Sequence, residues 1–356
     1  RPGPSSKSCM QHLGRNLRMM ARVGTSHSWG RGMSSSAPSD DISSRVPENY
    51  KPTKMEMIEK GPMMMGGAIG MMLRSFSQPG TIKDHARLIS IGLSPFCEKA
   101  RWALDLSGIP YTEDSHPPFL SAYYTLPATK GESSQVPMLI LPSGEILWDS
   151  HKILGFLATN HDSVRHLYPP SLHQPISAFE HLVHQRLGAP ARLFMYNRLL
   201  KGPPQTAYGL GRVLSRHSSK VEEFLYPPLF SAFIGKGILS VTKARRDENA
   251  KLALNEIRLF YEEVSSMLSD GRPFLFGDSF TAADLTFSAH TTLLQTPQNL
   301  DGMSLEDDLM PRELLDLRQE LLATRAGNHA TTMYKEHRAR DVIHPVSGPR
   351  DKSLFG

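Results

Sequence analysis

Residues 86–108 have the sequence ARLISIGLSPFCEKARWALDLSG, which predicts a strand that leads directly into a helix. The apolar run 86–91 is typical of a buried strand. Ser94 is a preferred N-cap residue, and Pro95 suits the first helical position because it has no N–H to leave unpaired there. Gly108 suits the left-handed conformation that often follows the last residue of a helix. We therefore expect a helix that begins at Pro95 and ends just before Gly108.

The predicted helix start is also a favourable place for an anion. A helix N-terminus carries partial positive charge and unpaired N–H groups, and both favour a negative group such as a thiolate. Two further motifs follow, because Gln135-Val136-Pro137 precedes a short apolar run and Asp149-Ser150 opens another predicted helix. These three motifs, in this order, carry the functional interpretation.

The segment that contains the motifs has the alternating pattern of a small α/β layer. Two short apolar runs flank Pro142-Ser143-Gly144-Glu145, which is typical of a β-hairpin. The elements expected in chain order are strand 86–91, helix 95–107, strand 111–115, a short helix 119–126, hairpin strands 137–141 and 146–148, and helix 150–159.

The chain that follows Tyr168-Pro169-Pro170 is predicted to be helical. Segment 245–268 has one apolar stripe at helical spacing, and Gly271 follows it. Thr281 is expected to be an N-cap, with Asp284 reaching back to it in a variant of the capping box.

The predicted helices after residue 180 offer few candidate site residues. His181 and His184 lie three residues apart with no further metal ligand indicated nearby, so we expect a solvated or partly buried face there. Arg192, Tyr196 and Arg198 either line a cleft against the first domain or serve as packing and surface residues.

The composition is that of a globular chain with a basic first part. Of the 356 residues, 39% are apolar and 21% charged, and no run approaches the roughly eighteen apolar residues of a membrane span. Residues 1–80 hold 11 Lys and Arg against 5 Asp and Glu, whereas residues 81–356 hold 29 against 30. This distribution argues against a nucleic-acid groove in the folded part.

Residues 1–80 are expected to be a disordered leader. The first 39 residues are rich in Ser, Gly and Arg and contain no acidic residue, which is the composition of an organelle transit peptide. We therefore expect a plastid or mitochondrial location, with the cytoplasm as the alternative. The two cysteines, Cys9 and Cys97, form neither a disulfide framework nor a cysteine-rich zinc site, and no metal is expected.

Together the motifs resemble those of the cytosolic-type glutathione S-transferases. The resemblance lies in SPFCEKAR at 94–101, Gln135-Val136-Pro137, Asp149-Ser150 and FGDSFTAAD at 276–284. It implies an α/β plus all-α fold class. The implied order is a thioredoxin-like glutathione-binding domain over 81–162, an all-helical substrate domain over 170–342 and a tail over 343–356.

The resemblance implies that Ser94 is the catalytic residue. In serine-type members the matching hydroxyl donates a hydrogen bond to the glutathione sulfur and keeps it as a thiolate, and Pro95 and Phe96 lie in the same glutathione-binding loop. A donor hydroxyl and a positive helix end each lower a thiol pKa on physical grounds alone. The alternative is that Ser94 only caps its helix. No tyrosine lies between Tyr50 and Tyr111, which argues against a tyrosine-type site.

The other two motifs match binding residues of the family. Pro137 matches a cis-proline that turns the backbone of Val136 toward the cysteinyl unit of glutathione, with Gln135 beside it. Asp149 and Ser150 match an acidic-serine pair that holds the γ-glutamyl end. Many relatives have Glu or Gln at the position of Asp149, and a simple N-cap is the alternative for this pair.

Cys97 is the fourth residue of a run whose first position, Ser94, would hold the attacking cysteine of a redox protein. A dithiol mechanism is therefore absent, and Cys97 is expected to be a small buried residue. Its place near a helix start leaves a redox or mixed-disulfide role as the alternative.

The preferred hypothesis is a glutathione transferase that joins the glutathione thiolate to an electrophilic, apolar small molecule. The expected partners are glutathione, as co-substrate, and that electrophile, and pairing into a homodimer is common among relatives. Two alternatives stay open: other glutathione chemistry on the same fold, such as thiol–disulfide or peroxide reduction, isomerisation or dehalogenation, or a non-catalytic interaction module.

Overall fold

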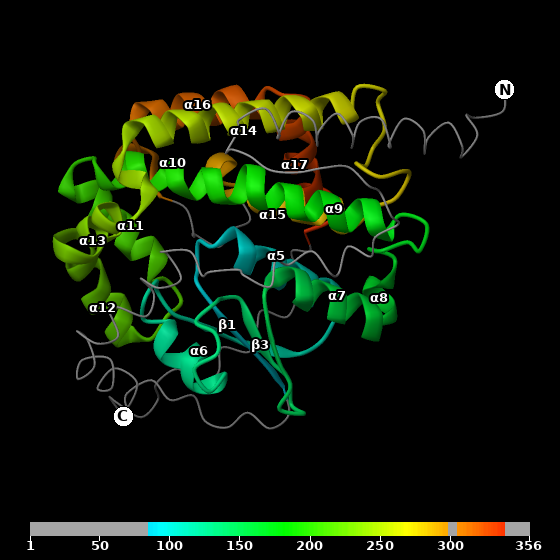
Figure 1. The fold of residues 1–356 in the computed structure, drawn as a ribbon, viewed down its shortest axis with the longest axis horizontal. Helices are drawn as coiled ribbons and strands as arrows, with labels where there is room; N and C mark the ends of the chain where they lie inside the picture. The colour runs from blue at the N-terminus through cyan, green and yellow to red at the C-terminus, as the bar shows by residue number, and fades with distance from the viewer. Residues whose placement is uncertain (1–84, 298–304, 339–356) are drawn as a thin grey trace, which may run out of the picture. The chain divides into compact units, whose positions relative to one another are not determined.

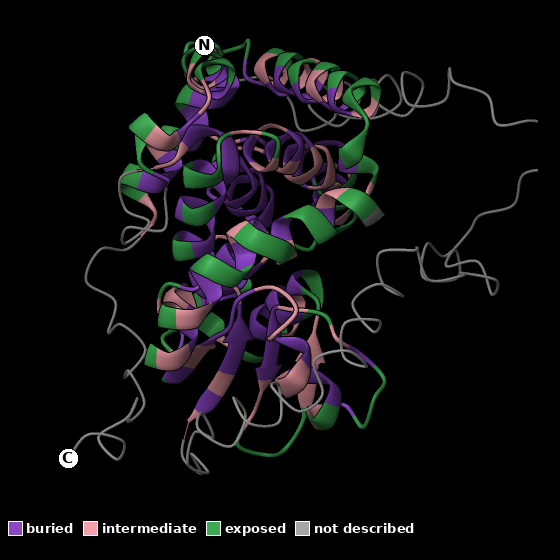
Figure 2. Cartoon of the chain, turned by 90° about the vertical axis from the view of Figure 1, so that its left-hand side faces the viewer, coloured by how far each residue is buried: buried purple, intermediate pink, exposed green. Residues whose placement is uncertain are grey.

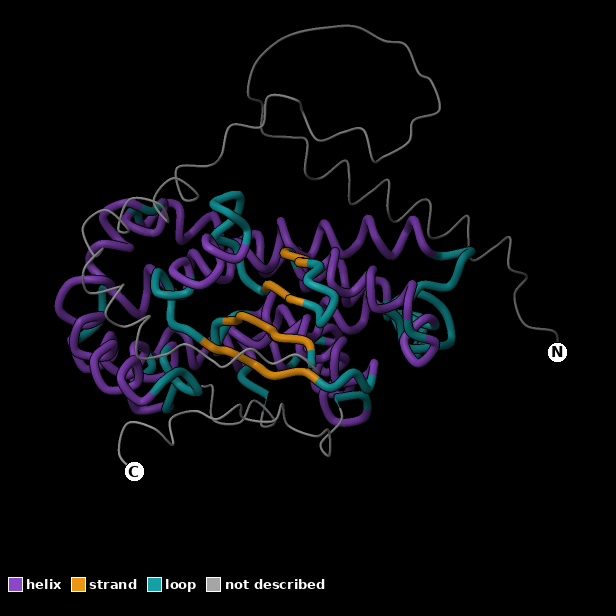
Figure 3. Tube along the Cα trace, turned by 90° about the horizontal axis from the view of Figure 1, so that it is seen from below, coloured by secondary structure: helices purple, strands orange, loops and turns teal. Residues whose placement is uncertain are grey.

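The computed structural model describes residues 85–297 and 305–338, so the predicted leader and tail lie outside the described residues. Its first half contains four strands: β1 (Ala86–Ser90), β2 (Tyr111–Ser115), β3 (Met138–Ile140) and β4 (Ile146–Trp148). They form one sheet (Figure 1 and Figure 3), and the order of its strands is β2-β1-β3-β4. The strand β1 is parallel to β2, whereas the pairings of β3 with β1 and β4 are antiparallel.

Helix α5 (Pro95–Ser107) connects β1 to β2 and begins and ends at the predicted residues. Ser94 Oγ accepts a hydrogen bond from the backbone N–H of Cys97 at 3.4 Å, which is an N-cap arrangement. Gly108 lies in the left-handed region, at φ 71°. The strand–helix prediction for this segment is therefore confirmed.

The predicted hairpin is also confirmed, as is the helix α7 (Ser150–Asn160) after it. The short helix α6 (Ala122–Ala128) begins three residues later than predicted. The reason is local, since Phe119 has a φ of 70°, which an α-helix cannot include.

After α7, all named elements of the described chain are helices or helical turns, as predicted. Its α-helices are α8 (Asp162–Arg165), α9 (His173–Val183), α10 (Ala189–Leu200), α11 (Pro204–Leu214), α12 (Lys220–Leu229), α13 (Gly235–Val241), α14 (Asp247–Met267), α15 (Ala282–Gln295), α16 (Arg312–Leu322) and α17 (Arg325–Glu336). The fold is thus a thioredoxin-like domain followed by an all-helical domain. None of the described helices combines the length and apolar character needed to cross a bilayer.

Single π and 3-10 turns join some of these helices. The π turn η2 (His184–Gly188) joins α9 to α10, and the three form one continuous rod (Figure 1). A second π turn, η3 (Phe230–Ile234), joins α12 to α13. The 3-10 turn η4 (Lys243–Arg245) occupies the start of the predicted helix 245–268, so α14 begins at Asp247 instead.

Helix α15 is the centre of the helical domain, and all fourteen of its residues are buried. Figure 2 shows that the buried residues of the helices gather in the middle of the molecule. It packs against α9 and α17 within that domain and against α5 of the thioredoxin-like domain. Because both domains contribute to this contact, the start of α5 lies beside the helical domain.

The capping box predicted at the start of α15 is present. Asp284 Oδ2 accepts hydrogen bonds from the backbone N–H and the hydroxyl of Thr281, both at 2.9 Å. Its Oδ1 accepts from Leu275 N at 2.8 Å and lies 3.1 Å from His329 Nε2. A fully buried carboxylate therefore joins the loop before α15 to α17.

We expect Asp284→Ala to lower the free energy of unfolding by about 3–5 kcal/mol, because it leaves several buried donors without an acceptor. Denaturant unfolding measures this change. Asp316→Ala is the matched control, since Asp316 is exposed and pairs with Arg312 across 2.9 Å. The control should cost less than about 1 kcal/mol, and equal losses in the two variants would contradict the prediction.

His116 is a second contact between the domains. Its ring lies 3.1 Å from Asp114 at Nε2 and 2.9 Å from Glu222 of α12 at Nδ1, and it stacks on Tyr124 of α6. Burial alone lowers the pKa of His116, but the two carboxylates outweigh this effect and raise it to about 9. The buried ring is therefore a cation at neutral pH.

This cation makes stability depend on pH. The pKa of an unfolded histidine is about 6.5, so the stabilisation is complete below that pH and is lost as the pH rises through about 9. We expect the free energy of unfolding to fall by on the order of 3 kcal/mol from this group between pH 6 and 10. His116→Gln should flatten that dependence, whereas His166→Gln, at an exposed position, should retain it. Parallel curves for wild type and His116→Gln would refute the assignment.

Candidate functional site

The sheet brings the three predicted motifs to one edge. Met138, the first residue of β3, pairs with Ile89 near the end of β1 and with Trp148 at the end of β4. The β1–α5 loop with Ser94, the residues before β3 and the corner after β4 therefore start from the same end of the sheet. In the sequence, Ser94 precedes Gln135 by about forty residues, and Pro137 precedes Asp149 by about a dozen.

The motif before β3 has the geometry that the resemblance implies. The peptide bond between Val136 and Pro137 is cis. Pro137 is buried, Val136 is half-buried and Gln135 is exposed. The carbonyl of Pro137 accepts a hydrogen bond from Asp149 N at 3.2 Å, which joins this motif to the corner after β4.

Ser94 lies partly exposed at the N-cap of α5. Its hydroxyl oxygen accepts the hydrogen bond from Cys97 N, and a hydroxyl that accepts one hydrogen bond can still donate its own proton. The N–H groups of the first helical turn lie around it, and they give the same place partial positive charge. Ser94 therefore caps its helix and can still donate to an anion.

Asp149 has the same capping role on α7. Its Oδ1 accepts from His151 N at 2.7 Å, and its side chain is exposed, whereas Ser150 is buried in the first turn. The backbone of Asp149 has a φ of 97°. Such a conformation costs a non-glycine residue about 1–3 kcal/mol, and it is found most often at binding and catalytic sites.

The side chain of Phe96 faces the helical domain. Its ring centroid lies 4.9 Å from that of His184 in η2 and 4.8 Å from that of His290 in α15. A Cβ on Gly188 would lie 2.7 Å from His290 Cδ2 and 3.0 Å from Phe96 Cζ, so only glycine allows this close approach. The site is thus bordered by both domains.

Both histidines at this border are neutral at pH 7. Burial lowers the pKa of His290 to about 3 and also lowers that of His184. The negative charge of Asp149 opposes the shift in the pKa of His184. His181 and His184 are both exposed, which confirms the prediction of a solvated face, but that prediction did not identify the position of His184 beside Phe96.

A buried carboxylate, Glu180, holds the two domains together behind Phe96. It accepts from Lys99 Nζ at 2.6 Å, Tyr168 Oη at 2.7 Å and Thr286 Oγ1 at 3.0 Å, and it lies 3.2 Å from His151 Nδ1. Burial raises the pKa of Glu180, but Lys99 and His151 outweigh this and lower it to about 2. No sequence signal indicated that Lys99 pairs with Glu180, because the two residues come from distant helices.

Arg198 does not take part in this border. Its guanidinium pairs with Glu313 of α16 at 2.7 Å and lies over the ring of Phe194, one turn earlier on the same helix. Of the two alternatives for Arg198, packing within the helical domain is therefore confirmed.

Cys97 is turned away from the edge and into the core. Its Sγ accepts a hydrogen bond from Ile91 N at 3.3 Å, and the residue is fully buried. Burial raises the pKa of the thiol, although Arg101 acts in the opposite direction. This arrangement favours the small buried residue over a redox nucleophile.

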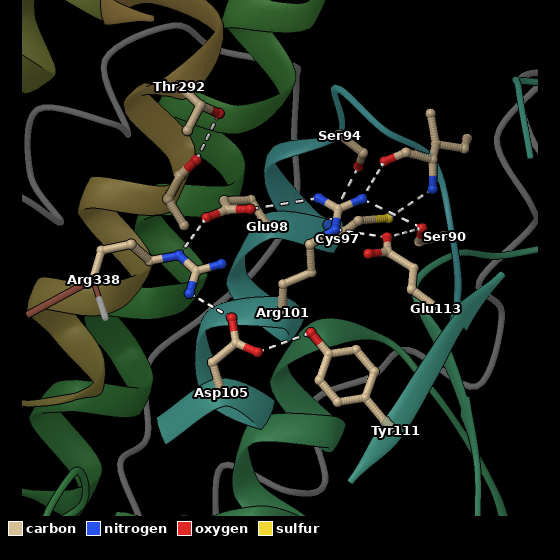
Figure 4. Close-up of polar contacts among 12 residues, drawn as sticks. Ser90, Ser94, Cys97, Glu98, Arg101, Asp105, Tyr111, Glu113, Thr292 and Arg338 are labelled. Carbon is tan, nitrogen blue, oxygen red and sulfur yellow. Dashed lines mark hydrogen bonds and ion pairs between the residues drawn. The ribbon is translucent and has the colours of Figure 1, made fainter. Parts of the chain in front are cut away.

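A chain of buried charges anchors the helix that carries Ser94 (Figure 4). Arg101 donates to Glu113 of β2 at 2.7 Å and to the carbonyl of Ile91 at 3.0 Å. Glu98 accepts from Arg338, which follows α17, at 2.9 Å. The start of α5 is therefore bound to both β2 and the end of the helical domain.

Within 85–297 and 305–338, no group of three or more His, Cys, Asp or Glu side chains is arranged to hold a metal ion.

Residues 93–160 match the family model of the glutathione S-transferase N-terminal domain. The chain carries a glutathione S-transferase N-terminal domain. The match spans all three motifs, and it confirms the resemblance that the sequence predicts. No curated protein matches the chain.

Several solved structures are similar in fold to this chain. A glutathione S-transferase of Ceriporiopsis subvermispora in complex with glutathione is 16% identical, with a TM-score of 0.49 over 72% of this chain and 98% of that one. A glutathione transferase of Phanerochaete chrysosporium is 15% identical, with a TM-score of 0.49 over 72% and 99% of the two chains. Likenesses of this size carry no conclusion about activity.

We expect Cys97 to be unreactive in the folded protein because its thiol is buried and its pKa is raised. The Cys9→Ser variant leaves Cys97 as the only thiol. A thiol-reactive chromogenic disulfide should label this variant only after unfolding in guanidinium. Stoichiometric labelling of the native protein within minutes would contradict this prediction and would make a redox role for Cys97 plausible again.

Proposed function

We propose that this protein is a glutathione transferase, in which Ser94 holds the glutathione sulfur as a thiolate. The observation that carries the proposal is the state of the Ser94 hydroxyl. It caps α5 as an acceptor, and it is able to donate its proton to an anion at the positive end of the helix.

The chemical gain comes from the pKa of the thiol. A free thiol with a pKa of about 8.5 is only a few per cent ionised at neutral pH. A donor hydroxyl and a helix N-terminus both favour the charged form, so they raise the fraction of nucleophile at that pH. The proton leaves on binding, so the reaction needs no general base.

The rest of the sheet edge fits the γ-glutamyl end and the central cysteinyl unit of glutathione. The first-turn N–H groups at Ser150 and its hydroxyl suit the carboxylate of a γ-glutamyl group. Asp149 uses Oδ1 for its cap, and its other oxygen is suited to the ammonium group. The backbone of Val136, set by the cis bond to Pro137, suits the cysteinyl amide.

The border with the helical domain suits an apolar second substrate. Phe96 is only partly buried, and neutral His184 lies beside it. In the proposed step the sulfur forms a bond to an electrophilic carbon, and the leaving group departs with the bonding electron pair.

Burial of Cys97 argues against thiol–disulfide reduction through this residue. A non-catalytic module differs from the proposal in a measurable way, because it would bind glutathione without turning over any electrophile.

Ser94→Ala should reduce conjugation of a generic aryl halide by roughly ten- to a hundredfold, which is the loss of one charge-assisted hydrogen bond to sulfur. The ultraviolet absorbance of bound thiolate should also titrate at a higher pH in this variant. Ser94→Thr retains a hydroxyl and should keep much of the activity, and Cys97→Ala should keep nearly all of it. Undiminished activity and an unchanged titration in Ser94→Ala would overturn the proposal.

A further inference from the structure

The chain between α10 and α14 forms an exposed face that the proposed function does not use. Helix α12, the turn η3 and helix α13 follow one another without a break in helical backbone conformation. On this segment Phe224 is 80% exposed, Phe233 is 72% exposed and Leu229 is 42% exposed. Large apolar side chains with this much exposure are unusual when they gather on one element.

All three residues point to solvent from this segment. Leu229 and Phe233 are four residues apart, about one helical turn, whereas Phe224 lies five residues before Leu229 within α12 and is therefore offset around the helix. The opposite side holds Tyr226 and Phe230, both buried against the rest of the molecule. The segment therefore presents large apolar side chains to solvent as well as to the core. Figure 2 views the molecule from the side on which α11, α12 and α13 lie in Figure 1.

The charge on this segment has one sign. Residues 224–246 contain four Lys and Arg and no Asp or Glu, which gives a net charge of +4. The four basic residues are all exposed: Lys236, Lys243, Arg245 and Arg246. By contrast, the exposed residues of the next helix, α14, include Asp247, Glu248, Lys251 and Arg258 and thus mix both signs.

The acidic residues just before this segment are directed elsewhere. Glu222 is buried against His116, and Glu223 accepts from Lys220 Nζ at 3.1 Å. Neither leaves a negative charge on the apolar side of α12.

We propose that the face formed by residues 224–246, which we call the α12–α13 face, binds the surface of an anionic lipid membrane. Exposed Phe and Leu side chains enter the boundary between headgroups and acyl chains, and Lys and Arg bind the anionic headgroups. A basic apolar helix lying in the interface is the arrangement that such a surface favours.

Charge argues against the other occupants of this face. A second copy of the chain would bring two faces of net charge +4 together. The leader is also basic, with 11 Lys and Arg against 5 Asp and Glu in residues 1–80, so it is not complementary to the face. An anionic lipid surface supplies both the apolar layer and the opposite charge.

The experiment uses the full chain and sedimentation with two kinds of vesicle, phosphatidylcholine alone and phosphatidylcholine with phosphatidylserine. We expect binding to the anionic vesicles that weakens with salt and little binding to the neutral ones. The double variant Phe224→Ser, Phe233→Ser should raise the apparent Kd for anionic vesicles at least about tenfold. Leu252→Ser is the matched control, because Leu252 is 66% exposed on α14 but lies outside the face.

A second measurement separates this face from the basic leader. In Phe233→Trp, the added tryptophan should shift its emission to the blue with anionic vesicles only, relative to wild type treated in the same way. Circular dichroism and the thermal midpoint check that each variant is folded. Unchanged vesicle binding by the folded double variant, with no emission shift in Phe233→Trp, would overturn the proposal. Self-association that the double variant abolishes, without vesicle binding, would overturn it in favour of a second copy.

Discussion

Helix α5 contains three charged side chains that are almost completely buried: Glu98, Lys99 and Arg101. A buried charge is costly unless a partner of opposite charge neutralises it, so each requires a partner from another part of the chain. Lys99 forms an ion pair with Glu180 of α9, and Arg101 forms one with Glu113 of β2. Glu98 forms an ion pair with Arg338, which follows α17. The position of α5 is therefore set by three distant elements at once.

This constraint determines where the candidate site lies. The N-terminus of α5 carries Ser94 and Phe96, and the Lys99–Glu180 pair holds the same helix against the helical domain. Phe96 consequently lies between His184 and the sheet edge, where both domains meet. The charges that secure the domain contact are thus only a few residues from the hydroxyl proposed to bind sulfur.

The helical domain has one surface that packs against the thioredoxin-like domain and another that is exposed to solvent. Its fully buried helix α15 and the rod of α9 and α10 face the thioredoxin-like domain, and Gly188 permits the close packing there. The segment between α10 and α14 is held to the thioredoxin-like domain through His116 and Glu222. Its other side carries the exposed Phe224 and Phe233. The same segment can therefore stabilise the domain contact and present a surface to a partner.

The sequence by itself determined the elements whose causes are local. The N-cap at Ser94, the left-handed Gly108 and the capping box of Thr281 and Asp284 depend on neighbouring residues, and all three were predictable. The cis bond before Pro137 followed from the resemblance. Only the tertiary structure decided the burial of Cys97, the neutralisation of Lys99 by Glu180 and the place of His184 beside Phe96, because each depends on groups tens of residues away in the chain. Helical spacing identifies which side of a helix is apolar, but it does not identify the helix that packs against that side.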